Sequence, residues 1–178
     1  MIKASLFHGS KKSGLLTLNA AASHNTIAFG PAIYCTSDRL VAEAQSGAIV
    51  VYQVEVEGPA QGVIEFDRPL SEASGKAQAA VTSFLRRYKM LSLLDHNDDR
   101  VDFLQDRVAD QLVKRGASYP GKALFNRILA EEGVWLMRGE MHGMAKSGLM
   151  DRGTQWAILD DRHISIVQES SLSYRHVI

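Results

Sequence analysis

Strand-like and helix-like patterns of apolar residues occupy separate parts of this sequence. Short strand-like runs occur before about residue 66 and after about residue 134, whereas residues 71–133 carry apolar side chains at helical spacing. A chain that forms strands, then helices, then strands again is typical of the α+β class with a mainly antiparallel sheet. We therefore predict a single α+β domain over residues 1–178, with a helical insertion in the middle of the chain at about 71–133.

The clearest strand covers Ile49–Val56, which begins as a continuous apolar run and ends in strict alternation. A shorter apolar run, Ala4–His8, is predicted as the first strand. In a second predicted strand, Ala32–Thr36, alternation places Tyr34 and Thr36 on the same face of the sheet. Further strands are expected at Gly62–Phe66, Trp156–Leu159 and Ile164–Val167.

The middle of the chain shows three apolar stripes at helical spacing and no strand pattern. The stripes are Val81, Phe84, Leu85 and Tyr88; Val101, Leu104, Val108 and Leu112; and Leu124, Ile128 and Leu129. Two interpretations are open: a helical bundle that packs on the sheet, or an insertion that recognises a partner. The first is favoured, because apolar stripes usually form core. Shorter helices are predicted at Asp38–Ser46 and Glu140–Lys146.

Composition limits the class of protein. Twenty basic and twenty acidic residues give a net charge of +0, which argues against a dedicated nucleic-acid coat or a polybasic membrane anchor. The single cysteine, Cys35, excludes an intrachain disulfide and favours a reducing, cytoplasmic setting. The sequence shows no evident signal peptide and no apolar run of membrane-spanning length. The six histidines are scattered without metal-ligand spacing, so no metal site is predicted.

A candidate site begins where the first predicted strand meets polar residues, in Leu6-Phe7-His8-Gly9-Ser10. His8 offers a ring nitrogen to a hydroxyl group. Gly9 has no Cβ, so its backbone can come close to a ligand, and an amide beyond the end of the strand ladder could donate to a carboxamide or phosphate. The alternative for His8 is an ordinary structural residue at a strand end.

Two later stretches extend this pattern. Gly30-Pro31-Ala32-Ile33-Tyr34-Cys35-Thr36 is followed by a predicted helix, and Gly153-Thr154-Gln155-Trp156-Ala157-Ile158 opens a late strand. With the first stretch, they resemble the ADP-ribosyltransferase superfamily in its histidine–tyrosine branch, which includes the poly(ADP-ribose) polymerases and diphtheria-type toxins. The passage from Ala145 to Thr154 is similar to the small phage-encoded anti-CRISPR mono-ADP-ribosyltransferases. The resemblance covers about residues 2–58 and 141–168.

The resemblance implies a split antiparallel sheet, with NAD bound in a cleft between its halves. By the same resemblance, His8 would hold a ribose hydroxyl of NAD, and the Gly9 backbone would bind the nicotinamide carboxamide. Tyr34 would stack on the nicotinamide ring, while Ser10 and Thr36 would add polar contacts. No metal is implied.

The chain departs from the family pattern at the catalytic acid. Gln155 stands where the family has Glu, and a Gln side chain cannot take up a proton. Asp151, in the loop before the strand, could supply the missing charge, although it could equally be a solvated turn acid. Two smaller departures are Ala32 in place of a Gly and Cys35 in place of an aromatic residue.

The expected activity is therefore transfer of a single ADP-ribose from NAD to a macromolecule, with release of nicotinamide. A protein target is favoured over nucleic acid, and no membrane partner is expected. Such a protein could be a phage or bacterial effector acting in the cytoplasm of a host. Three alternatives stay open: a degenerate fold that binds NAD, ADP-ribose or a partner without catalysis, an NAD glycohydrolase toxin, and an RNA phosphotransferase. The neutral chain disfavours the last.

Overall fold

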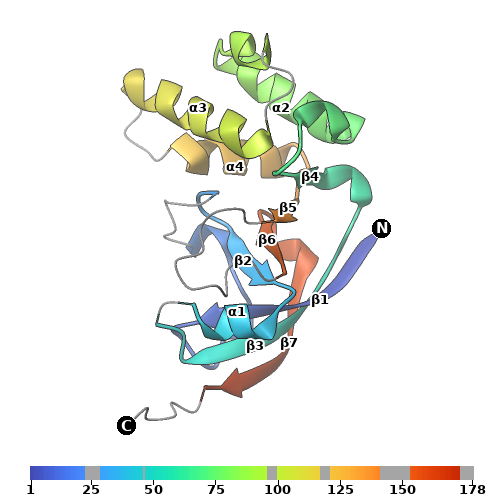
Figure 1. The fold of residues 1–178 in the computed structure, drawn as a ribbon, viewed down its shortest axis with the longest axis vertical. Coiled ribbons are helices and arrows are strands. Elements are labelled where there is room, and N and C mark those ends of the chain that lie inside the picture. The colour runs from blue at the N-terminus through green and yellow to red at the C-terminus, as the bar shows by residue number, and fades with distance from the viewer. Residues whose placement is uncertain (23–28, 46, 96–99, 117–120, 141–152, 173–178) are drawn as a thin grey trace.

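The computed structural model describes residues 1–22, 29–45, 47–95, 100–116, 121–140 and 153–172. The strands are β1 (Ile2–Ser10), β2 (Ile33–Thr36), β3 (Val50–Gly58), β4 (Val63–Glu65), β5 (Leu136–Glu140), β6 (Thr154–Ile158) and β7 (Ile164–Ser171). The helices are α1 (Arg39–Glu43), α2 (Gly75–Arg87), α3 (Val101–Lys114) and α4 (Gly121–Glu131). Figure 1 shows α2, α3 and α4 together at one end of the molecule, and β1, β3 and β7 at the other.

The strands form one seven-stranded sheet in the order β4-β5-β6-β2-β1-β3-β7. Every neighbouring pair is antiparallel except β4 and β5, which are parallel and are separated along the chain by the three long helices. The predicted α+β class with a mainly antiparallel sheet is confirmed. The helical character of 71–133 is confirmed as well, since α2, α3 and α4 fall within this range.

The sheet is divided near its centre. β1 and β3 pair over nine residues and β2 and β6 over four, whereas β1 and β2 meet at one pair, Phe7 with Thr36. We call β4-β5-β6-β2 the β2 half of the sheet and β1-β3-β7 the β1 half. Because only one residue pair joins the halves, their ladders are nearly independent at this boundary.

Two apolar clusters hold the fold together. The first, here called the helical core, joins α2, α3 and α4 to the β2 half, and contains Phe84, Phe125, Met137 and Ala157. This cluster confirms that the middle helices pack on the sheet. The second contains residues from both halves of the sheet, among them Leu6, Val54, Ile33 and Trp156. It therefore connects the two halves through side chains where the ladder does not.

Three predicted boundaries are wrong. β1 does not end at His8 but continues to Ser10, because Gly9 and Ser10 pair with β3. The first helix is shorter than the predicted 38–46: Asp38 is its N-cap, accepting a hydrogen bond from the Leu40 N–H at 2.9 Å, and α1 ends at Glu43.

Glu140 was expected to open a helix, but it ends β5, because it pairs with Thr154 of β6. The remainder of that predicted helix lies outside the described residues. Within the described part of the chain, no helix combines the length and the hydropathy that crossing a membrane requires.

Candidate functional site

The point where the sheet divides lies at the end of β1. Continuing the register beyond Phe7 would place His8 opposite Cys35 and Gly9 opposite Tyr34, yet among the described residues neither pair forms. Instead, the His8 ring spans this gap, with its Nδ1 2.7 Å from the Tyr34 carbonyl oxygen. A side chain thus links the two halves of the sheet where backbone pairing stops.

The hydrogen bond to Tyr34 fixes the tautomer of His8. A carbonyl oxygen can only accept, so Nδ1 carries the proton and Nε2 of the neutral ring is an acceptor. Burial lowers the pKa of His8 below its ordinary value, and the hydrogen bond to Tyr34 opposes this by a smaller amount. His8 is therefore a neutral acceptor at pH 7 and not a cation.

This burial predicts how stability depends on pH. The pKa of His8 is lower in the folded than in the unfolded chain, so the unfolded chain binds more protons once the pH falls below about 6.5. The contribution of His8 to stability is complete above the unfolded pKa and declines as the pH falls towards the folded pKa. We expect the difference in melting temperature between the parent and His8→Gln to become less favourable to the parent on going from about pH 7.5 to about pH 5.5. A difference that stays constant over this range would contradict the prediction.

Gly9 lies inside the ladder, paired with Val51, and not beyond its end as the sequence suggested. A Cβ on Gly9 would lie 2.1 Å from the carbonyl oxygen of Ala42 and 2.9 Å from Oε1 of Gln45. The space left by the missing side chain is therefore filled by α1. Close packing of α1 on β1 is a sufficient physical reason for glycine here.

Tyr34 lies at the border of the helical core and is half-buried. Its hydroxyl accepts a hydrogen bond from the Phe29 N–H at 3.1 Å and donates one to the Gly30 carbonyl at 2.5 Å. Burial raises the pKa of this hydroxyl, so it stays neutral. Both ends of Tyr34 are thus held: its carbonyl by His8, and its hydroxyl by the turn that precedes β2.

Thr36 and Gln155 sit opposite one another in the β2–β6 pair. Residues facing each other across a ladder share a face, and so do residues two apart on one strand, so Tyr34, Thr36 and Gln155 lie on the same face of the sheet. Thr36 is 7% exposed, and its Oγ1 accepts from the Asp38 N–H at 3.2 Å. Oε1 of Gln155 is buried and has no hydrogen-bond partner among the described residues.

The structure thus gathers the side chains of Tyr34, Thr36 and Gln155 on one face of the β2 half. His8 meets this group through the Tyr34 backbone carbonyl, and its ring stacks beside Tyr52 of β3. Gly9 adjoins His8 along β1. Ser10 lies one residue further on, pairs with Val50, and accepts from the Lys12 N–H through its Oγ at 3.0 Å. Asp151 lies outside the described residues.

Sequence reasoning missed Ser37, which joins the start of β6 to the end of β2. Its Oγ accepts from the Thr154 N–H at 3.0 Å, and its own N–H donates to the Thr154 carbonyl at 3.3 Å. Gly153 has φ +77°, and a Cβ there would lie 2.7 Å from the Ser37 Oγ. Ser37 therefore fixes the backbone next to Gln155. The run Thr36-Ser37-Asp38 signalled only a helix cap.

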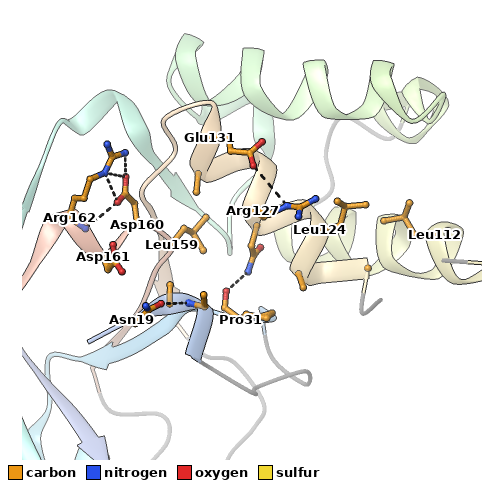
Figure 2. Close-up of a pocket in the computed structure, with 16 residues that line it drawn as sticks. Asn19, Pro31, Leu112, Leu124, Arg127, Glu131, Leu159, Asp160, Asp161 and Arg162 are labelled. Atoms are coloured by element: carbon orange, nitrogen blue, oxygen red, sulfur yellow. Dashed lines mark hydrogen bonds and ion pairs between the residues drawn. The ribbon is translucent and has the colours of Figure 1, made fainter. Parts of the chain in front are cut away.

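A cavity of about 700 Å³ lies between helices α3 and α4 and the ends of β2 and β6 that are remote from Thr36 and Gln155 (Figure 2). Pro31 precedes β2 and Leu159 follows β6, so the length of β2, four residues or about 13 Å, separates this cavity from Thr36. The cavity therefore does not include Thr36 or Gln155, although Pro31 of its lining belongs to the turn that holds the Tyr34 hydroxyl. Its lining includes Leu112, Leu124, Asn126, Arg127, Glu131, Leu159 and Asp160.

Among the described residues, no cluster of three or more His, Cys, Asp or Glu side chains has an arrangement that could hold a metal ion. Comparison with models of known protein families gives no match, and neither the curated proteins nor the solved structures contain a match to this chain.

Proposed function

We propose that this protein is a mono-ADP-ribosyltransferase that takes NAD as its substrate, releases nicotinamide, and modifies a macromolecular target, with a protein favoured over nucleic acid. The observation that carries the proposal is the hydrogen bond from His8 to the Tyr34 carbonyl across the divided sheet. It joins the two residues that the resemblance assigns to NAD, at the boundary where the resemblance expects a cleft.

The chemistry of the gathered side chains fits NAD. Nε2 of His8 can accept from a ribose hydroxyl, because Nδ1 is already committed to Tyr34. The Tyr34 ring offers an aromatic surface for stacking, held by hydrogen bonds at both ends. Oε1 of Gln155 is a buried acceptor without a partner in the described structure, and such atoms normally find a donor. A hydroxyl or amide of the substrate would supply one.

The proposed reaction breaks the bond between the ribose C1′ and the nicotinamide nitrogen and forms a bond from C1′ to the target's nucleophilic atom. That atom gives up a proton. Positive charge develops on the ribose, and a buried acceptor oxygen such as that of Gln155 lowers its energy. Gln155 cannot accept the proton, so we assign this task to Asp151, the carboxylate that precedes it in the chain.

Three measurements on the parent test the proposal: the shift in melting temperature caused by NAD, the release of nicotinamide, and the labelling of lysate proteins by labelled NAD. A ligand that binds only the folded state raises its stability by mass action. We expect all three signals. A parent that neither is stabilised by NAD nor releases nicotinamide would overturn the proposal.

Tyr34→Ala should reduce the NAD-induced shift in melting temperature, because aromatic stacking contributes about 0.5–1.5 kcal/mol beyond the area it buries. Tyr88→Ala is the matched control. Tyr88 is also a half-buried tyrosine against the helical core, but it caps α2, away from the divided sheet. The assignment of Tyr34 fails if the two variants retain equal shifts.

Gln155→Glu should keep or raise nicotinamide release, since it restores the acid of the family pattern. Asp151→Ala should lower transfer to the target more than Gln155→Ala, with NAD binding largely kept in both, because a group that acts in the transition state changes rate more than affinity. The comparison requires nicotinamide release and target labelling for all three variants. Full activity in Asp151→Ala would remove Asp151 from the mechanism and leave Gln155 as the catalytic residue.

The amide at position 155 also favours a second candidate, a protein that binds NAD or ADP-ribose without catalysis. Stabilisation by NAD with no release of nicotinamide would identify this function. Release of nicotinamide without any labelled protein or nucleic acid would instead identify an NAD glycohydrolase.

A further inference from the structure

The turn Phe29–Pro31 holds the Tyr34 hydroxyl, and it is itself held by two helices of the middle segment. Asn126 of α4 donates through Nδ2 to the Phe29 carbonyl at 2.6 Å and to the Pro31 carbonyl at 3.1 Å. Gln105 of α3 donates through Nε2 to the same Phe29 carbonyl at 3.0 Å and to Oδ1 of Asn126 at 2.8 Å. We call Gln105 and Asn126 the carboxamide pair.

The carboxamide pair stands out in the helical core because it is polar and almost inaccessible to solvent. Gln105 is 0% exposed and Asn126 is 3% exposed, whereas the side chains that make up this core are apolar. Burying a side-chain amide is unfavourable unless its hydrogen bonds are made. Here the donors of both residues reach the turn or each other, whereas Oε1 of Gln105 has no partner among the described residues. Their hydrogen bonds therefore specify the position of the turn.

Gly30 shows how closely the turn lies against α4. Its φ of +79° suits glycine, and a Cβ there would lie 2.7 Å from Cβ of Lys122 and 3.4 Å from Nδ2 of Asn126. The turn in its present place gives two hydrogen bonds to the Tyr34 hydroxyl, one through the Phe29 N–H and one through the Gly30 carbonyl. Figure 2 shows the link from α4 to the Pro31 carbonyl as a dashed line.

We infer that the carboxamide pair is a positioning device for Tyr34: through the Phe29–Pro31 turn, α3 and α4 fix the ring that stacks on nicotinamide. This inference rests on the proposed function. The helical segment then contributes to the NAD site without touching the substrate, because its two amides hold the backbone that holds the tyrosine. Fixing a ring before the ligand arrives lowers the entropy lost on binding.

The test uses Asn126→Leu, which is similar in size and removes the two hydrogen bonds that Asn126 donates and the one that its Oδ1 accepts from Gln105. Gln105→Met is the second variant, in case Asn126→Leu does not fold. Val81→Ala is the control, because Val81 is buried in the same core on α2 and makes none of these hydrogen bonds. Each protein is labelled with fluorotyrosine for ¹⁹F NMR, with the Tyr34 signal assigned from Tyr34→Phe, and the Kd for NAD is measured.

We expect Asn126→Leu and Gln105→Met to move the Tyr34 signal and to weaken NAD binding by about tenfold, since a small misplacement can have a large effect. Val81→Ala should lower the melting temperature but leave both readouts near those of the parent. Unchanged Tyr34 signals in both variants, beside normal NAD binding by the parent, would overturn the inference alone. A parent that binds no NAD would overturn the proposed function and, with it, the role of the pair towards NAD.

Discussion

Trp135→Ala is expected to lower the free energy of unfolding by about 3–5 kcal/mol, as is usual for the largest buried side chains. Trp135 is 1% exposed, and its Nε1–H donates to the Pro59 carbonyl at 2.9 Å. Two glycines, Gly58 and Gly62, make room for its ring: a Cβ on either would come within 2.7 Å of an indole carbon. Truncation would leave a cavity that these backbone segments cannot fill, and the Pro59 carbonyl would keep only the hydrogen bond from the Gly62 N–H at 3.1 Å.

Chemical denaturation of the parent and of Trp135→Ala measures this loss. Trp135→Phe should lose less, because much of the ring volume remains while the hydrogen bond to Pro59 is removed. Val113→Ala serves as the surface control, since Val113 is 62% exposed and such substitutions usually change stability by less than about 0.5 kcal/mol. If the Trp135→Ala protein were as stable as the Val113→Ala protein, the predicted contribution of Trp135 to stability would be wrong.

Gly9→Ala should destabilise the protein and Gly75→Ala should not, although both replace glycine with alanine. At Gly9, a methyl group would lie 2.1 Å from the Ala42 carbonyl oxygen, and a backbone atom cannot move aside without moving α1. The expected loss is about 1–3 kcal/mol, the usual range for overpacking. At Gly75, the first residue of α2, nothing lies within 4 Å, so alanine should be neutral or stabilising by up to about 1 kcal/mol.

This pair of variants also separates two reasons for glycine at position 9. If the residue served only to admit a ligand, the unliganded Gly9→Ala protein would be as stable as the parent. A large loss without NAD would show that α1 requires the glycine, independently of any ligand. Denaturation in the absence of NAD therefore decides between them.

Local patterns predicted the elements whose hydrogen bonds or apolar faces are local. β3 was expected at 49–56 and forms at Val50–Gly58, because its alternation matches a strand with one buried face. α2, α3 and α4 followed from apolar stripes that now lie in the helical core. A sequence pattern of this kind indicates which side of an element is buried, and in the structure that side packs in the core.

Contacts between distant segments could not be predicted in the same way. Gln105 and Asn126 are polar residues on helices, and a pattern reading assigns such residues to the solvent face. Their burial becomes understandable only once the Phe29–Pro31 turn lies beside them. The contact of His8 with the Tyr34 carbonyl is similar, since it uses a side chain where a strand pattern predicts only backbone pairing.

The candidate site was predicted as a set of residues, and the structure supplies their arrangement. Tyr34 and Thr36 on one face followed from strand alternation. The placement of Gln155 opposite Thr36 required the β2–β6 pairing, which no local signal specifies. Ser37 was missed for the same reason, because its partner Thr154 is remote in sequence.

The pairing of β2 with β6 also bears on the order in which parts of the chain fold. The three long helices lie between these strands in the chain, and closing so long a loop costs entropy before any contact is gained. Helices form through local hydrogen bonds, so their formation does not require the pairing of β2 with β6. During folding, α2, α3 and α4 can therefore exist before Thr36 meets Gln155, and the face that gathers Tyr34, Thr36 and Gln155 is completed late. A chain released before β6 has emerged would lack this face.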